Sequence, residues 1–197
     1  GQHHPTPRLR VQPEPGGQVL SIHSQIVTDM VNNNIEFITT VPCKQLGGVI
    51  EEAENHNSIM HVPCNKEDEG MGLCAGAFMG GKRSAIIMQN TALGVTLNSL
   101  ATLIQFYHIP LPMLISYRGE LGEPVACQVE MALHTKALLA QMLIPTYHFH
   151  KREDAAELSL FEVPYKAAGN FYGDAANRRV RALFERNIDE DLRATVW

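Results

Sequence analysis

The chain has 197 residues, of which 45% are hydrophobic and 19% are charged, and a formal net charge of -5. This composition is typical of one globular domain with short appendages, and it excludes collagen-like, low-complexity and wholly disordered chains. A net negative charge argues against a nucleic-acid partner, because such partners are bound through phosphate neutralisation. No apolar run approaches the ~18 residues of a membrane span, so we expect a cytoplasmic protein without membrane contact.

The four cysteines form no CxxC pair and have no histidine at zinc-finger spacing, which predicts reduced thiols and no metal ligands in the chain itself. Residues 1–18 contain four prolines and three glycines, and we expect a disordered leader or a cloning remnant there. Residues 19–187 are predicted to form one domain, followed by a C-terminal tail over residues 188–197.

Hydrophobic periodicity predicts helices and strands that alternate along this domain. The expected helices span 19–31, 45–55, 66–79, 94–106 and 133–142, with a last helix opened by Pro164. The expected strands span 35–41, 59–62, 84–88, 112–117, 146–150 and 180–184. Strands that are apolar on both faces and separated by helices indicate an α/β fold, a mostly parallel doubly wound sheet with helices on both faces.

Ligands of such sheets bind at the carboxyl ends of the strands, so the polar residues at those ends are the candidates for chemistry. The helix after the second strand opens with Glu67, Asp68 and Glu69, which would stabilise the positive end of the helix dipole or serve a function. Its glycine-rich continuation over 70–81 predicts close approach of a second helix, a second subunit or a flat cofactor, since each helical glycine costs roughly 1 kcal/mol.

Gln89, Asn90 and Thr91 follow the third strand, where they could cap the next helix or contact a ligand. The chain has neither a Rossmann glycine fingerprint nor a Gly-Lys-Ser/Thr phosphate loop, which removes the usual support for nucleotide binding.

Four segments in order resemble the pyrimidine-binding domain of thiamine diphosphate-dependent 2-oxoacid decarboxylases: VPCKQL, NKEDEGMGLCAGAFMGGK, AIIMQNTALGVTLNSLATL and PLPMLISYRGELGEP. The resemblance covers most of residues 20–186. Within this family, the chain most resembles the branch of phosphonopyruvate and sulfopyruvate decarboxylases. Within that branch, it most resembles the alpha subunits that are separate chains. It implies decarboxylation of 3-sulfopyruvate to sulfoacetaldehyde and CO₂, with phosphonopyruvate or another 2-oxoacid as the alternative substrate.

The resemblance also implies roles for individual residues. Glu67 lies nine residues before Gly76, the family's spacing for the catalytic carboxylate that binds the pyrimidine ring nitrogen of the cofactor. The implied cofactor-binding residues are Glu67, Gln89, Asn90 and Thr91, and the implied substrate-binding residues are Cys43, Lys44, Asn90 and Arg118. An intersubunit salt bridge with Glu120 or Glu123 is the alternative role of Arg118.

The family holds the diphosphate and Mg²⁺ with a Gly-Asp-Gly motif followed by asparagine, and this chain contains no such pair; Gly173-Asp174-Ala175 matches it only superficially. The resemblance therefore implies a hetero-oligomer in which a second subunit holds most of the diphosphate and Mg²⁺. The active sites would lie between two alpha subunits or between an alpha and a beta subunit. A noncatalytic α/β interaction module is the competing interpretation.

Overall fold

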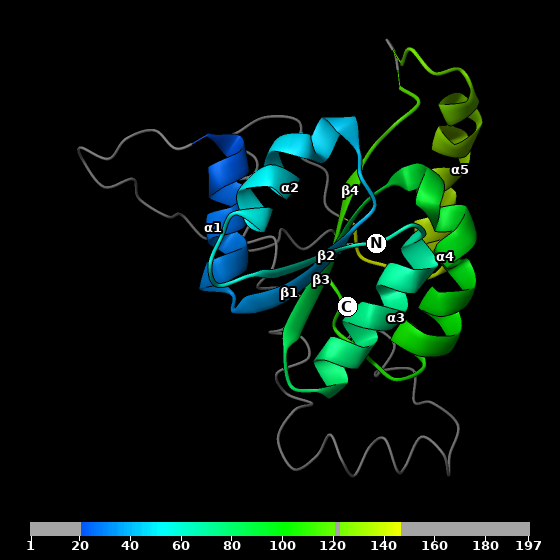
Figure 1. The fold of residues 1–197 in the computed structure, drawn as a ribbon. Helices are drawn as coiled ribbons and strands as arrows, with labels where there is room; N and C mark the ends of the chain where they lie inside the picture. The colour runs from blue at the N-terminus through cyan, green and yellow to red at the C-terminus, as the bar shows by residue number, and fades with distance from the viewer. Residues whose placement is uncertain (1–20, 121–122, 147–197) are drawn as a thin grey trace, which may run out of the picture.

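A four-stranded parallel sheet forms the centre of the computed structural model, which describes residues 21–120 and 123–146 (Figure 1). Its strands are β1 (Ile35–Thr40), β2 (Met60–Pro63), β3 (Arg83–Gln89) and β4 (Met113–Ser116). They lie in the order β2-β1-β3-β4, and every neighbouring pair is parallel. The strand order reverses between β1 and β3, and this switch point is where parallel sheets of this kind bind ligands.

Helices cover both faces of the sheet, which confirms the predicted doubly wound α/β fold (Figure 1). One face carries α1 (Ile22–Asn32) and α2 (Gly47–Glu54), the latter preceded by the 3-10 turn η1 (Lys44–Leu46). The opposite face carries α3 (Glu67–Met79), α4 (Leu93–Ser99) and α5 (Cys127–Gln141). Another 3-10 turn, η2 (Asn90–Ala92), leads into α4, and the π-helical segment η3 (Leu100–Gln105) continues it.

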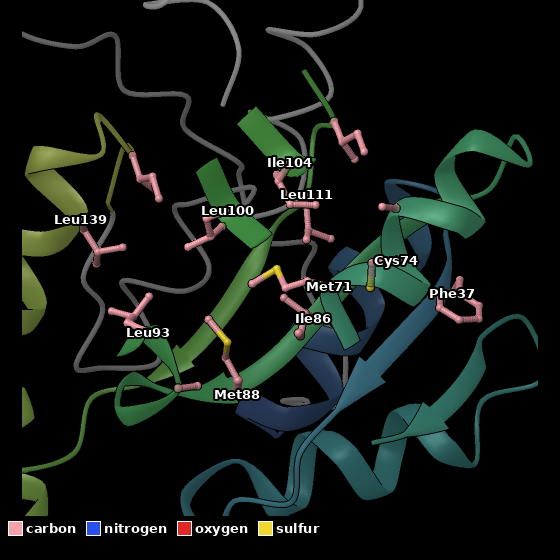
Figure 2. Packing of buried hydrophobic residues seen from close by; sticks show 14 residues of the cluster. Phe37, Met71, Cys74, Ile86, Met88, Leu93, Leu100, Ile104, Leu111 and Leu139 are labelled. Atoms are coloured by element: carbon pink, nitrogen blue, oxygen red, sulfur yellow. The ribbon is translucent and has the colours of Figure 1, made fainter. Parts of the chain in front are cut away.

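Successive residues of β3 point into two different hydrophobic cores. Ile86 and Met88 pack with Met71 of α3 in one core, shown in Figure 2, while Ala85 and Ile87 belong to the core under α1 and α2. All four of these β3 side chains are fully buried. Because side chains alternate across a strand, a strand covered on both faces has a continuous apolar sequence rather than an alternating one.

Most predicted elements within the described residues are present, with ends that differ by a few residues. The prediction for α5 is wrong by two turns, since the helix begins at Cys127 rather than at 133. Its first turns are largely exposed and Ala126 provides no capping side chain, so neither apolar periodicity nor a cap marks this start. The expected leader, residues 147–150 of the strand at 146–150, the last helix, the strand at 180–184 and the tail lie outside the described residues.

Among the described helices, none has the length and the apolar character that crossing a membrane requires.

Gly70 allows the first turn of α3 to lie close to the sheet. A Cβ atom at this position would be 2.9 Å from Thr39 Oγ1 and 3.1 Å from Ile86 Cδ1. At Gly76 in the same helix, an added Cβ would meet nothing within 4 Å. The expected close approach is therefore present at Gly70, where side chains of β1 and β3 make it, whereas Gly76 faces open space.

We expect Gly70→Ala to lower the free energy of unfolding by about 1–2 kcal/mol, because overpacking a buried site outweighs the gain in helix propensity. Gly76→Ala is the matched control and should raise the free energy of unfolding by up to ~1 kcal/mol. Urea unfolding of both variants measures these changes. Equal effects at the two positions would contradict the packing described for Gly70.

Candidate functional site

The candidate site lies at the carboxyl edge of the sheet, where the loops after all four strands carry the predicted functional residues. Arg118 follows β4 and forms a two-pronged ion pair with Glu123. Its Nε donates to Glu123 Oε2 at 2.7 Å, and its Nη2 donates to Glu123 Oε1 at 2.5 Å. The pair forms within one chain, so the salt bridge considered for Arg118 is made here with Glu123 of the same chain.

This ion pair is largely shielded from water, with 13% of the Arg118 side chain and 3% of the Glu123 side chain exposed. The hydrogen bond from Arg118 lowers the pKa of Glu123 to about 2, helped by the backbone amides of Gly119 and Val125. The same bond raises the pKa of Arg118. Both groups therefore stay charged over the whole range in which an enzyme works.

The Asn90 side chain fixes the backbone of Arg118. Its Nδ2 donates to the Arg118 carbonyl at 2.9 Å, and its Oδ1 accepts from the Arg118 amide at 3.0 Å. The second Nδ2 hydrogen reaches Thr135 Oγ1 on α5 at 3.1 Å, and Asn90 is fully buried. Both amide hydrogens of Asn90 are thus used inside the chain, and its oxygen accepts one bond from the backbone of Arg118.

Two further contacts join the ends of β1, β3 and β4. Cys43 Sγ, in the loop after β1, lies 3.0 Å from Ser116 Oγ at the end of β4. Arg118 Nη1 is 3.5 Å from Gln89 Oε1 at the end of β3, which is at the limit of a hydrogen bond. The structure thus brings together four of the predicted site residues: Cys43, Gln89, Asn90 and Arg118.

Glu67 is the first residue of α3, and its half-buried side chain makes no hydrogen bond or ion pair with any described residue. Its neighbours have the capping roles instead. Glu69 Oε2 accepts from the Asn65 amide at 3.3 Å, and Asp68 Oδ1 accepts from the Glu69 amide at 3.1 Å. Of the three carboxylates at this helix start, Glu67 is therefore the one left available for a ligand.

The other two predicted residues are Lys44 and Thr91, which directly follow Cys43 and Asn90 in the chain. Lys44 is exposed at the start of η1, and Thr91 is half-buried in η2. Neither makes a side-chain hydrogen bond or an ion pair within residues 21–120 and 123–146. Sequence reasoning missed Thr135; the available signal was a threonine within the pattern of an otherwise apolar helix face.

The depressed pKa of Glu123 predicts how stability responds to acid. The pKa of Glu123 is about 2 in the folded chain, against an ordinary value of 4.5, so the unfolded chain takes up the proton first as pH falls. The contribution of Glu123 is complete above pH 4.5 and is lost as pH falls through 2. We expect wild type to lose more unfolding free energy across this interval than Glu123→Gln, as measured by urea unfolding at a series of pH values; parallel curves would contradict this assignment.

Sequence comparison relates the chain to proteins of known name. The sulfopyruvate decarboxylase subunit alpha of Methanococcus maripaludis is 36% identical over 138 residues, which cover 66% of this chain and 83% of that protein. The chain belongs to the sulfopyruvate decarboxylase alpha-subunit family. Its relative of the same name in Methanothermobacter thermautotrophicus is 43% identical over 120 residues, or 61% of this chain and 73% of that protein. The resemblance carried by the four sequence segments is thereby confirmed.

A phosphonopyruvate decarboxylase is a more distant relative of the chain. The phosphonopyruvate decarboxylase of Streptomyces viridochromogenes is 27% identical over 100 residues, which cover 51% of this chain and 25% of that protein. No protein-family model matches the chain.

Proposed function

We propose that this chain is the alpha subunit of an enzyme that converts 3-sulfopyruvate to sulfoacetaldehyde and CO₂. The observation that carries the proposal is its identity of 36% and 43% to two curated alpha subunits that bear the name sulfopyruvate decarboxylase. The catalytic interpretation is favoured over a noncatalytic module because those relatives are named as enzyme subunits.

We propose thiamine diphosphate as the cofactor, and the residues at the sheet edge fit its pyrimidine half. When bound, the cofactor supplies the electron sink that decarboxylation of a 2-oxoacid requires. Glu67 fits the role of hydrogen-bonding partner to a pyrimidine ring nitrogen, because its carboxylate is half-buried and has no partner among the described residues. Gln89 and Thr91, at the end of β3, are proposed to orient the ring. Asn90, which is fully buried, is proposed to act there by holding the backbone of Arg118.

The diphosphate half and Mg²⁺ are assigned in this proposal mainly to a second subunit. The name "subunit alpha" in the relatives supports such a partner. Within the described part of the chain, no group of three His, Cys, Asp or Glu side chains is arranged to hold a metal ion. The active sites are proposed to lie at interfaces between two alpha subunits or between an alpha and a beta subunit.

Substrate binding by this acidic protein needs cations placed next to the anionic groups of sulfopyruvate. Lys44 follows β1 at the candidate site, is exposed, and has no ion-pair partner among the described residues. Arg118, with Cys43 beside it, lies at the end of β4. We propose that Lys44 and Arg118 bind the two acidic ends of the substrate, with Cys43 in the wall between them.

Lys44→Met tests the contribution of the lysine. Loss of one charge-assisted hydrogen bond costs ~1.5–3 kcal/mol, so the KM for sulfopyruvate should rise at least about tenfold, and more than the KM for pyruvate. Lys82→Met is the control, since Lys82 precedes β3 at the opposite edge of the sheet and pairs with Glu36. An equal rise for both substrates would remove Lys44 from sulfonate recognition.

The function itself is tested by a substrate comparison with the chain assembled with its partner subunit. Release of CO₂ and aldehyde is measured with sulfopyruvate, phosphonopyruvate and pyruvate. The proposal predicts the highest kcat/KM for sulfopyruvate. Preference for phosphonopyruvate would establish the alternative that the Streptomyces relative suggests, and turnover of none of the three would refute the proposed reaction.

A further inference from the structure

We propose that Glu123 is a positioning residue, which holds the Arg118 guanidinium so that one edge faces the sulfonate or carboxylate of the substrate. This inference rests on the proposed function, since it names the groups that would recognise the acidic substrate. Glu123 itself has no exposed surface to offer to a ligand, because its side chain is only 3% exposed.

Both oxygens of Glu123 are fully used inside the chain. Oε2 accepts from Arg118 Nε at 2.7 Å and from the Gly119 amide at 3.2 Å. Oε1 accepts from Arg118 Nη2 at 2.5 Å and from the Val125 amide at 3.1 Å. Four donors thus fix the carboxylate in the loop after β4, two from the Arg118 guanidinium and two from backbone amides.

The guanidinium has five N–H donors in a rigid plane, and Glu123 takes one from Nε and one from Nη2. On the other edge, Nη1 makes a weak contact, the 3.5 Å approach to Gln89 Oε1. The guanidinium also interacts with Cys43, whose Sγ lies 3.0 Å from Ser116 Oγ at the end of β4. Two hydrogens held in one plane match the spacing of two oxygens of a carboxylate or a sulfonate.

The backbone of Arg118 is fixed independently of its side chain. Asn90 binds both the amide and the carbonyl of Arg118, at 3.0 Å and 2.9 Å. With backbone and guanidinium both held, little freedom remains to be lost when an anion binds, and preorganisation of this kind raises affinity and orients the bound group. Because Glu123 neutralises the charge of Arg118, the advantage lies in the direction of the hydrogen bonds and not in net attraction.

The test compares Glu123→Gln with wild type in the assembled enzyme, using the ratio of kcat/KM for sulfopyruvate to kcat/KM for pyruvate. We expect this ratio to fall by about tenfold, the effect of one poorly directed charge-assisted hydrogen bond. Glu120→Gln, an exposed neighbour in the same loop, is the matched control and should leave the ratio unchanged. Glu123→Asp keeps the charge and should recover part of the loss.

A merely structural role would lower kcat/KM for both substrates by the same factor, and an unchanged ratio would therefore overturn the inference. A higher sulfopyruvate-to-pyruvate ratio in Glu123→Gln would also overturn the inference. It would mean that Glu123 only weakens the attraction between Arg118 and the sulfonate by offsetting the charge of Arg118. In an Arg118→Met background, Glu123→Gln should produce no further fall in the ratio, because its effect passes through Arg118.

Arg118→Lys serves if Glu123→Gln does not fold. Lysine keeps the charge but cannot present two donor edges, so the ratio should fall in the same way, and a retained ratio would refute the inference. Failure of the proposed function is distinguished from failure of the inference by the wild-type assembly. Absence of sulfopyruvate turnover in wild type defeats the function, whereas normal wild-type turnover with an unchanged Glu123→Gln ratio defeats the inference alone.

Discussion

Glu67→Gln is expected to lower kcat of the assembled enzyme by ~100-fold or more, which is the scale of a lost proton-transfer or proton-holding group. Glutamine has nearly the same shape but no negative charge, so it cannot hold a ring nitrogen in the protonated form that a carboxylate favours. Folding should be unchanged, because Glu67 makes no hydrogen bond or ion pair to any described residue. Steady-state kinetics and a urea unfolding curve of the same preparation measure the two quantities.

Glu69→Gln is the control for Glu67→Gln, because the two residues share the first turn of α3 and differ in their contacts. Glu69 accepts the Asn65 amide at 3.3 Å, and glutamine retains an oxygen for this bond. Its kcat should therefore stay close to that of wild type. Near-normal turnover of Glu67→Gln, or an equal loss in both variants, would exclude Glu67 from cofactor activation.

The second large effect is expected from separating the subunits. Without its partner, the chain should bind thiamine diphosphate only weakly, because the charges of the diphosphate and Mg²⁺ dominate such a site and are assigned to the partner. Adding the partner should strengthen binding by orders of magnitude in calorimetric titrations with Mg²⁺ present. Tight binding by the chain alone would show that it holds the diphosphate itself.

The open face of α3 is a candidate for the surface that meets the partner. Gly72 and Gly76 have nothing within 4 Å of an added Cβ, and Leu73 and Met79 beside them are 40% and 61% exposed. Obligate interfaces bury more than ~2,000 Å² in total, so the assembled complex should survive size-exclusion chromatography at micromolar concentration. Gly76→Leu should weaken that association, whereas the smaller Gly76→Ala change should be tolerated better.

The fold is predictable because its helices and strands follow from hydrophobic patterns among neighbouring residues. The continuous apolar run of β3 and the helical periods on either side of it can be recognised from neighbouring residues, and both sheet faces are indeed covered. The position of Glu67 at the start of α3 follows from the same local pattern. The start of α5 was missed, since its exposed first turns carry neither an apolar stripe nor a cap.

The network around Arg118 could not be derived from the sequence, because its contacts join distant positions. The side chain of Asn90 binds Arg118, at a sequence separation of 28 residues, and Thr135, at a separation of 45. Cys43 contacts Ser116 across a separation of 73 residues. In the sequence alone, a polar residue after a strand is typical of a helix cap. In the structure, the Asn90 side chain instead connects the end of β3 to the backbone of Arg118 after β4. Such pairings become visible only when the strand order β2-β1-β3-β4 is known.

The most direct test of the account is the release of CO₂ from 3-sulfopyruvate, measured with thiamine diphosphate and Mg²⁺ for the chain alone, for its partner subunit alone, and for their mixture. We expect that neither subunit alone has measurable activity and that the mixture decarboxylates sulfopyruvate at an ordinary enzymatic rate. Decarboxylation of sulfopyruvate by the chain alone at the rate of the mixture would contradict it.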